Sequence, residues 1–148
     1  SLWNLGAKLC AGAKDPMQGP PGMHAVEHLG KSLMFGCKDC GDCSLPDIAF
    51  LCPESSCAKN QRNGPCGGTR DGKCEVEDFE CIWSRAYDRL KHEGREEELL
   101  AHTPVLQDQK LRGTSSWANT WLGRDHLAAH NRSSKQESGT QELKKRSG

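Results

Sequence analysis

The sequence is poor in apolar residues and has no excess of charge of either sign. Hydrophobic residues make up 34% of its 148 positions, aromatic residues make up 5%, and tyrosine occurs once. The mean hydropathy is −0.75, and no run approaches the roughly 20 apolar residues that cross a bilayer. Lys plus Arg and Asp plus Glu each number 20, which argues against a polyanionic partner. We therefore expect no binding to nucleic acid or to membranes.

Several motifs of common enzyme classes are also missing. The sequence has no GxGxxG or GxxxxGK[ST] phosphate-binding loop, no HExxH zinc motif and no βα repeat that could form a barrel. The chain is therefore expected to be neither catalytic alone nor able to bind a large organic cofactor alone. Its first residues, Ser1–Lys8, lack the pattern of a secretory signal. Together with the odd number of cysteines, this predicts reduced thiols and a cytoplasmic location.

Cysteine is what the sequence has instead, with eight of the nine between Cys37 and Cys81. Cys37, Cys40 and Cys43 are separated by two residues each, on a loop that contains a glycine. This triplet suits a cubane iron–sulfur cluster, whereas zinc sites usually take their thiolates as two separated pairs. Cys52 precedes a proline, as in bacterial ferredoxins, but eight residues separate it from Cys43 instead of three. It could therefore bind the same cluster or a neighbouring one.

The remaining cysteines of this region predict a second four-thiolate site. They are Cys57, Cys66, Cys74 and Cys81. Glycines on both sides of Cys66 could turn backbone N–H groups towards cluster sulfurs, or serve tight turns alone. The alternative for both sites is a zinc knot that only holds loops together. Cys10 stands apart and is predicted to be a free thiol. Lys59, Arg62 and Arg70 could balance thiolate charge or lie on a solvated loop face.

The predicted fold is a small, irregular, α-containing, metal-bound domain, with cysteine-rich loops flanked by two or three helices. Residues 1–23 are predicted to be an extended lead-in arm, 24–126 the metal-binding domain, and 127–148 a polar disordered tail. Two helices are predicted, one over 24–35 and one over 77–91. Their apolar stripes are Val26, Leu29, Leu33 and Met34 in the first, and Phe79, Ile82, Trp83, Ala86, Tyr87 and Leu90 in the second.

Outside the cysteines, two pairs of histidines have the i, i+4 spacing of neighbours on a helix surface, His24 with His28 and His126 with His130. Neither pair carries the acidic partner of a metalloprotease motif, so exposed helix surface is the predicted role of both.

Several of these segments resemble one known family. The chain is similar to the cysteine-rich C-terminal domain of methylenetetrahydrofolate reductases, and to the small iron–sulfur subunit of the enzyme from acetogenic bacteria. The resemblance runs from about residue 24 to 126 and maps the family's cysteines onto all eight between Cys37 and Cys81. The motifs that carry it are Gly36–Asp47, Leu51–Gly68, Gly72–Val76, Cys81–Trp83, Thr114–Asn119 and Gly123–His126.

The resemblance implies a function in electron transfer. One [4Fe-4S] cluster, with ligands for a second, would relay electrons to a flavin-bearing methylenetetrahydrofolate reductase subunit with a TIM barrel. A ferredoxin or a larger redox subunit would be the electron donor. Two alternatives stay open: a structural zinc-binding interaction module of the same assembly, and an accessory subunit of corrinoid-linked methyl transfer.

Overall fold

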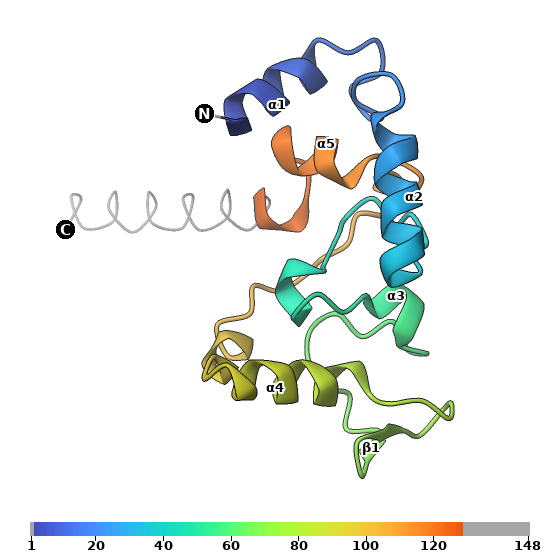
Figure 1. Ribbon diagram of the computed structural model, residues 1–148, viewed down its shortest axis with the longest axis vertical. Coiled ribbons are helices and arrows are strands. Elements are labelled where there is room, and N and C mark those ends of the chain that lie inside the picture. The colour runs from blue at the N-terminus through green and yellow to red at the C-terminus, as the bar shows by residue number, and fades with distance from the viewer. Residues whose placement is uncertain (1, 129–148) are drawn as a thin grey trace, which may run out of the picture.

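A computed structural model describes residues 2–128, and the architecture is mostly helical (Figure 1). The predicted tail, 127–148, lies almost wholly outside the described residues. In chain order the elements are α1 (Leu2–Ala11), α2 (Met23–Phe35), the 3₁₀ turn η1 (Pro46–Ile48), α3 (Pro53–Ser56), β1 (Thr69–Arg70), β2 (Lys73–Cys74), α4 (Ile82–His92), the 3₁₀ turns η2 (Glu96–Leu99) and η3 (Gln109–Leu111), and α5 (Ser116–Trp121).

Helices α1, α2 and α5 lie together at one end of the molecule (Figure 1). Residues 2–11 were expected to be extended and are instead helical, which corrects that part of the prediction. The prolines that suggested an extended arm begin at Pro16, after the helix has ended. Helix α1 packs on α5 at Gly6, where a Cβ would come within 2.9 Å of the Trp121 ring.

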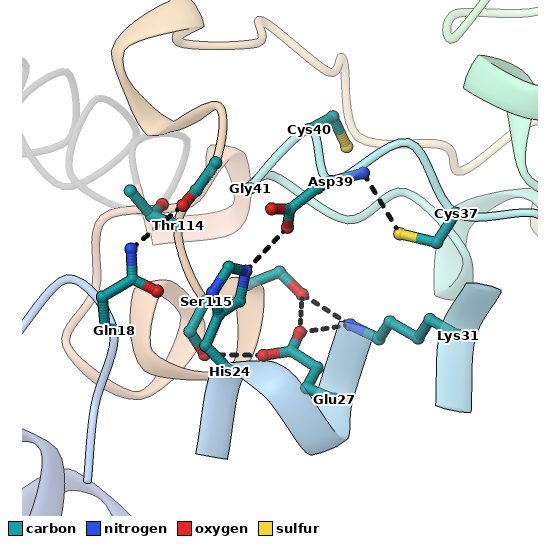
Figure 2. A network of polar contacts seen from close by, with 12 residues as sticks. Gln18, His24, Glu27, Lys31, Cys37, Asp39, Cys40, Gly41, Thr114 and Ser115 are labelled. Carbon is teal, nitrogen blue, oxygen red and sulfur yellow. Dashed lines mark hydrogen bonds and ion pairs between the residues drawn. The ribbon is translucent and has the colours of Figure 1, made fainter. Parts of the chain in front are cut away.

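Helix α2 confirms the first predicted helix, but it is oriented with its polar side inwards. The chain leaves the helix at Gly36, whose φ of 62° is left-handed. Of its residues only Glu27 is fully buried. The Glu27 carboxylate accepts hydrogen bonds of 2.6 Å from the hydroxyls of Ser115 and Ser116, and one of 2.6 Å from the Lys31 ammonium. These bonds tie α2 to the start of α5 (Figure 2).

The apolar core lies at the other end of the molecule, under α4. Helix α4 confirms the second predicted helix. The buried residues of the core are Ile48, Ala49, Leu51, Ile82, Trp83, Ala86 and Leu90. The helix begins at Ile82, five residues later than expected, because the preceding segment pairs with the hairpin β1–β2. In that pairing, Cys81 N–H donates to the Gly72 carbonyl at 2.8 Å, and Cys74 N–H donates to the Phe79 carbonyl at 3.0 Å.

The cysteine-bearing segment 37–57 runs between these two ends (Figure 1). It contains only the short η1 and α3 turns, as expected for a cysteine-rich region with little periodicity. No helix within residues 2–128 is long and apolar enough to cross a membrane. The predicted small, irregular, helical fold is therefore confirmed, while its metal-bound state stays a prediction.

Candidate functional site

Four of the predicted cysteines line one cavity. Its wall includes the triplet Cys37, Cys40 and Cys43, and also Cys52, so the structure places Cys52 beside the triplet. The cavity has a volume of about 20 Å³. Among residues 2–128, no set of three or more Cys, His, Asp or Glu side chains is arranged so that it could hold a metal ion. None of the nine cysteines forms a disulfide.

The loop that carries the triplet has a backbone shape fixed by its neighbours (Figure 2). Asp39 has a left-handed φ of 56°, and its N–H donates to the Cys37 sulfur at 3.4 Å. Its carboxylate lies 2.9 Å from Nε2 of His24 on α2. Gly41 also has a left-handed φ, of 75°, and its carbonyl accepts a 2.7 Å hydrogen bond from the buried amide of Asn119. The middle of the loop is thus held by side chains of α2 and α5.

Gly41 leaves no room for a side chain. A Cβ on Gly41 would overlap the carbonyl group of Leu111, which crosses directly over the loop. The Leu111 carbonyl also accepts a hydrogen bond from the Thr114 hydroxyl. The close approach of the two backbones therefore depends on glycine at position 41.

Two cations lie next to the thiols. Burial raises the pKa of the Cys37 and Cys43 thiols, and the nearby Lys31 ammonium only partly opposes it. Arg62 is buried and donates to the Ser44 hydroxyl at 3.0 Å and to the Glu54 carboxylate at 2.7 Å. Burial alone would lower the pKa of Arg62, but the neighbouring Cys40 and Glu54 raise it. Its Nε atom is buried without a hydrogen-bond partner, so the cavity wall still holds one unused donor.

His126, which follows α5, also holds the cysteine loop in place. Its buried imidazole lies between two carboxylates, with Nδ1 2.6 Å from Asp42 and Nε2 3.0 Å from Asp47. Burial alone would lower the pKa of His126, but the two aspartates raise it to about 9. The imidazole is therefore charged at neutral pH, and it joins the segment after α5 to both sides of Cys43.

The other four cysteines do not line the cavity of Cys37, Cys40, Cys43 and Cys52. Cys66 is exposed, Cys74 lies on β2 and Cys57 packs against the core under α4. Each accepts a backbone N–H at 3.4 Å, from Gly68, Val76 and Gln61 respectively. The bond from Gly68 agrees with the expectation that turns near Cys66 direct N–H groups at sulfur.

Cys81 and Cys10 have opposite surroundings. Cys81 precedes α4, where burial acts to raise its thiol pKa. The Thr69 hydroxyl and the N–H groups of Trp83 and Ser84 outweigh that effect and lower it. This fits the expectation that the start of this helix favours a thiolate. Cys10 is fully buried away from the cavity, and burial raises its pKa.

Sequence reasoning missed the side chains that hold the loop in place. His126 was expected on an exposed helix surface and is instead buried between Asp42 and Asp47, which corrects that prediction. Asn119 and Glu27 were not identified either. The only signal was the pair of motifs Thr114–Asn119 and Gly123–His126, which carry the side chains that reach back to the loop.

We predict that Gly41→Ala is far more destabilising than Gly22→Ala. The two glycines have φ values of 75° and 79°, but nothing lies within 4 Å of a Cβ at Gly22. Gly22→Ala should therefore lose only the energy of placing alanine in the left-handed conformation, about 1 kcal/mol of unfolding free energy. Gly41→Ala adds a collision with backbone and should cost about 3 kcal/mol more. Urea denaturation of both variants measures the difference, and equal losses would show that the loop is not pinned under Leu111.

We also predict that His126 makes stability fall in alkaline solution. A folded pKa of about 9 against an ordinary value of 6.5 means that the stabilisation is complete below pH 6.5. It is lost as the pH rises through about 9, and it amounts to about 3 kcal/mol. Unfolding free energies of the wild type and His126→Gln, compared from pH 6 to 10, isolate this group from the nearby thiols. The difference in unfolding free energy between the two proteins should become smaller as the pH rises, and a constant difference would contradict a charged His126.

Comparison with known proteins gives one family. The family described as "Methylene-tetrahydrofolate reductase C terminal" matches residues 20–109, which include every cysteine except Cys10. No curated protein and no solved structure matches the chain. The match relates the chain to methylenetetrahydrofolate reductase, and so to the oxidoreductases of one-carbon metabolism. It covers well over half of the sequence, and we conclude that the chain belongs to the methylenetetrahydrofolate reductase C-terminal family.

Proposed function

We propose that the chain is an iron–sulfur electron-transfer component of a methylenetetrahydrofolate reductase assembly. The observation that carries the proposal is the cavity lined by Cys37, Cys40, Cys43 and Cys52. Four thiols are the full ligand set of one [4Fe-4S] cluster. When bound there, such a cluster would supply one-electron transfer to a flavin-bearing partner. The donor would be a ferredoxin or a larger redox subunit, and the location cytoplasmic.

The surroundings of the four thiols suit an anionic group. Lys31 and Arg62 place positive charge beside the cavity, where four thiolates would otherwise repel one another. The N–H that Asp39 donates to the Cys37 sulfur is a polar contact of the kind that raises the reduction potential of a cluster. Because the pKa values of Cys37 and Cys43 are raised, loading the site with metal should release protons.

A second candidate is a structural zinc site on the same four thiols. The cavity volume of about 20 Å³ favours it, since this is roughly the space of one or two waters and so of a single ion. A cluster would require the loop between Cys37 and Cys43 to move outwards on loading. In the zinc case the chain would bind its partner without transferring electrons.

The remaining cysteines could bind a second metal group. We propose Cys57, Cys66, Cys74 and Cys81 as its ligands. The proposal is supported by the hydrogen bonds that backbone N–H groups donate to each of these sulfurs. Within residues 2–128 no three of these side chains already meet as metal ligands, so the four sulfurs would have to come together when the group binds. If this second group exists, replacing Cys66 and Cys74 together should halve the iron content.

The decisive experiment counts iron, acid-labile sulfide and zinc in protein purified without oxygen. We expect iron and sulfide in equal amounts, and a brown colour that dithionite bleaches. Cys40→Ala should lose the cluster of the four-cysteine cavity, because only three of the four thiolate ligands remain. Cys10→Ala, which removes a buried thiol away from the cavity, should keep it. Zinc without sulfide would establish the structural alternative, and full iron in Cys40→Ala would contradict the ligand assignment.

A further inference from the structure

Helix α2 has its apolar side turned towards solvent. Its four large apolar side chains, Val26, Leu29, Leu33 and Met34, are 68%, 62%, 81% and 74% exposed. Ala25 and Gly30 are the other exposed residues of the helix. The exposed face therefore carries no charged residue, whereas the buried position is a glutamate. This is the reverse of the pattern of a surface helix in a globular protein.

The contacts of the inner face fix this orientation. Glu27 accepts hydrogen bonds from Ser115, Ser116 and Lys31, and His24 lies against Asp39 of the cysteine loop (Figure 2). Rolling the helix to bury its leucines would break these bonds and leave charged groups without partners, which costs several kcal/mol. The described part of the chain therefore leaves this apolar face uncovered.

The shape of this face suits a helix of a larger partner. The apolar positions follow the i, i+3, i+4, i+7, i+8 spacing of a packing surface, and nothing lies within 4 Å of a Cβ at the central Gly30. Another backbone could therefore approach closely there. Four side chains cover far less than the roughly 800 Å² per partner of a stable protein interface. A pair of chains joined through α2 alone would fall short of that area, so the partner must also contact other parts of the chain.

Helix α1 offers such additional surface at the same end of the molecule (Figure 1). Its residues Leu2, Leu5 and Leu9 recur on one side of the helix and are all more than half exposed. The core under α4, in contrast, is closed by its own residues. The N-terminal helices α1 and α2 thus each carry a row of uncovered apolar side chains.

We propose that the outer face of α2 is the surface that docks the catalytic part of methylenetetrahydrofolate reductase. The family is named as the C-terminal part of that enzyme, and the sequence has no pattern for a catalytic barrel. The identity of the partner rests on the proposed function, but the location of the surface does not. Because the inner face of α2 contributes Lys31 to the four-cysteine cavity, a docked partner lies about one helix diameter, roughly 10 Å, from the thiols.

The test pairs two double variants in the full chain. Leu29→Gln with Leu33→Gln changes the proposed surface. Leu100→Gln with Leu106→Gln is the control, because both leucines lie elsewhere and are 89% and 80% exposed. The affinity of each for the purified reductase subunit of the same organism is measured by calorimetry. We expect the α2 variant to bind at least tenfold more weakly than the wild type and the control variant to bind with unchanged affinity. Equal affinities of the two variants would overturn the proposal.

Three further measurements interpret the other outcomes. Light scattering of the chain alone and flotation with phosphatidylglycerol vesicles test the other occupants. A dimer or vesicle binding that the α2 variant abolishes, with reductase binding intact, would overturn the proposal in favour of a second copy or a lipid surface. Iron content, measured on the same samples, should be equal in all proteins. Iron-free protein that still loses reductase binding in the α2 variant would refute the electron-transfer function and leave the docking surface standing.

Discussion

Buried charge, not apolar packing, holds the cysteine loop in place. The protonated His126 lies between Asp42 and Asp47, and Glu27 gathers Lys31 and two serine hydroxyls at the start of α5. A chain with 34% hydrophobic residues cannot surround every loop with aliphatic side chains. Opposite charges that are fully paired offer an alternative, and removing one partner of such a pair is expensive. The positions of the four thiols therefore depend on groups far away in the sequence.

The two ends of the molecule follow different physical rules. Under α4, Ile82, Trp83 and Ala86 pack against the segment around Ile48, as in an ordinary small domain. Between α2 and α5 the buried contacts are polar, and the apolar side chains face outwards. This division fits a module that folds on its own at one end and is completed by a partner at the other. The four-cysteine cavity lies beside the end with the exposed apolar face.

The local pattern of the sequence predicted the helices over 24–35 and 77–91, because their apolar spacing and their glycine stops are short-range signals. It also indicated that Cys37, Cys40 and Cys43 could point at one common centre. The structure brings them to the wall of one cavity, and their binding of a metal stays a prediction. The sequence pattern could not predict that Glu27 would lie on the buried face of α2. A regular apolar stripe such as that of Val26 and Leu29 predicts a buried apolar face, and the contacts that bury Glu27 come from residues far away in the sequence. Nor could it place His126 against Asp42, since that contact spans 84 positions.

The reach of α5 and its flanks has a practical consequence for how this module is delimited. The family match ends at residue 109, yet Asn119 and His126, which position the loop, come later in the chain. A recombinant fragment cut at the end of the match would keep every cysteine and lose the scaffold that orients four of them. Domain boundaries drawn from cysteine content alone would therefore give a poor expression target.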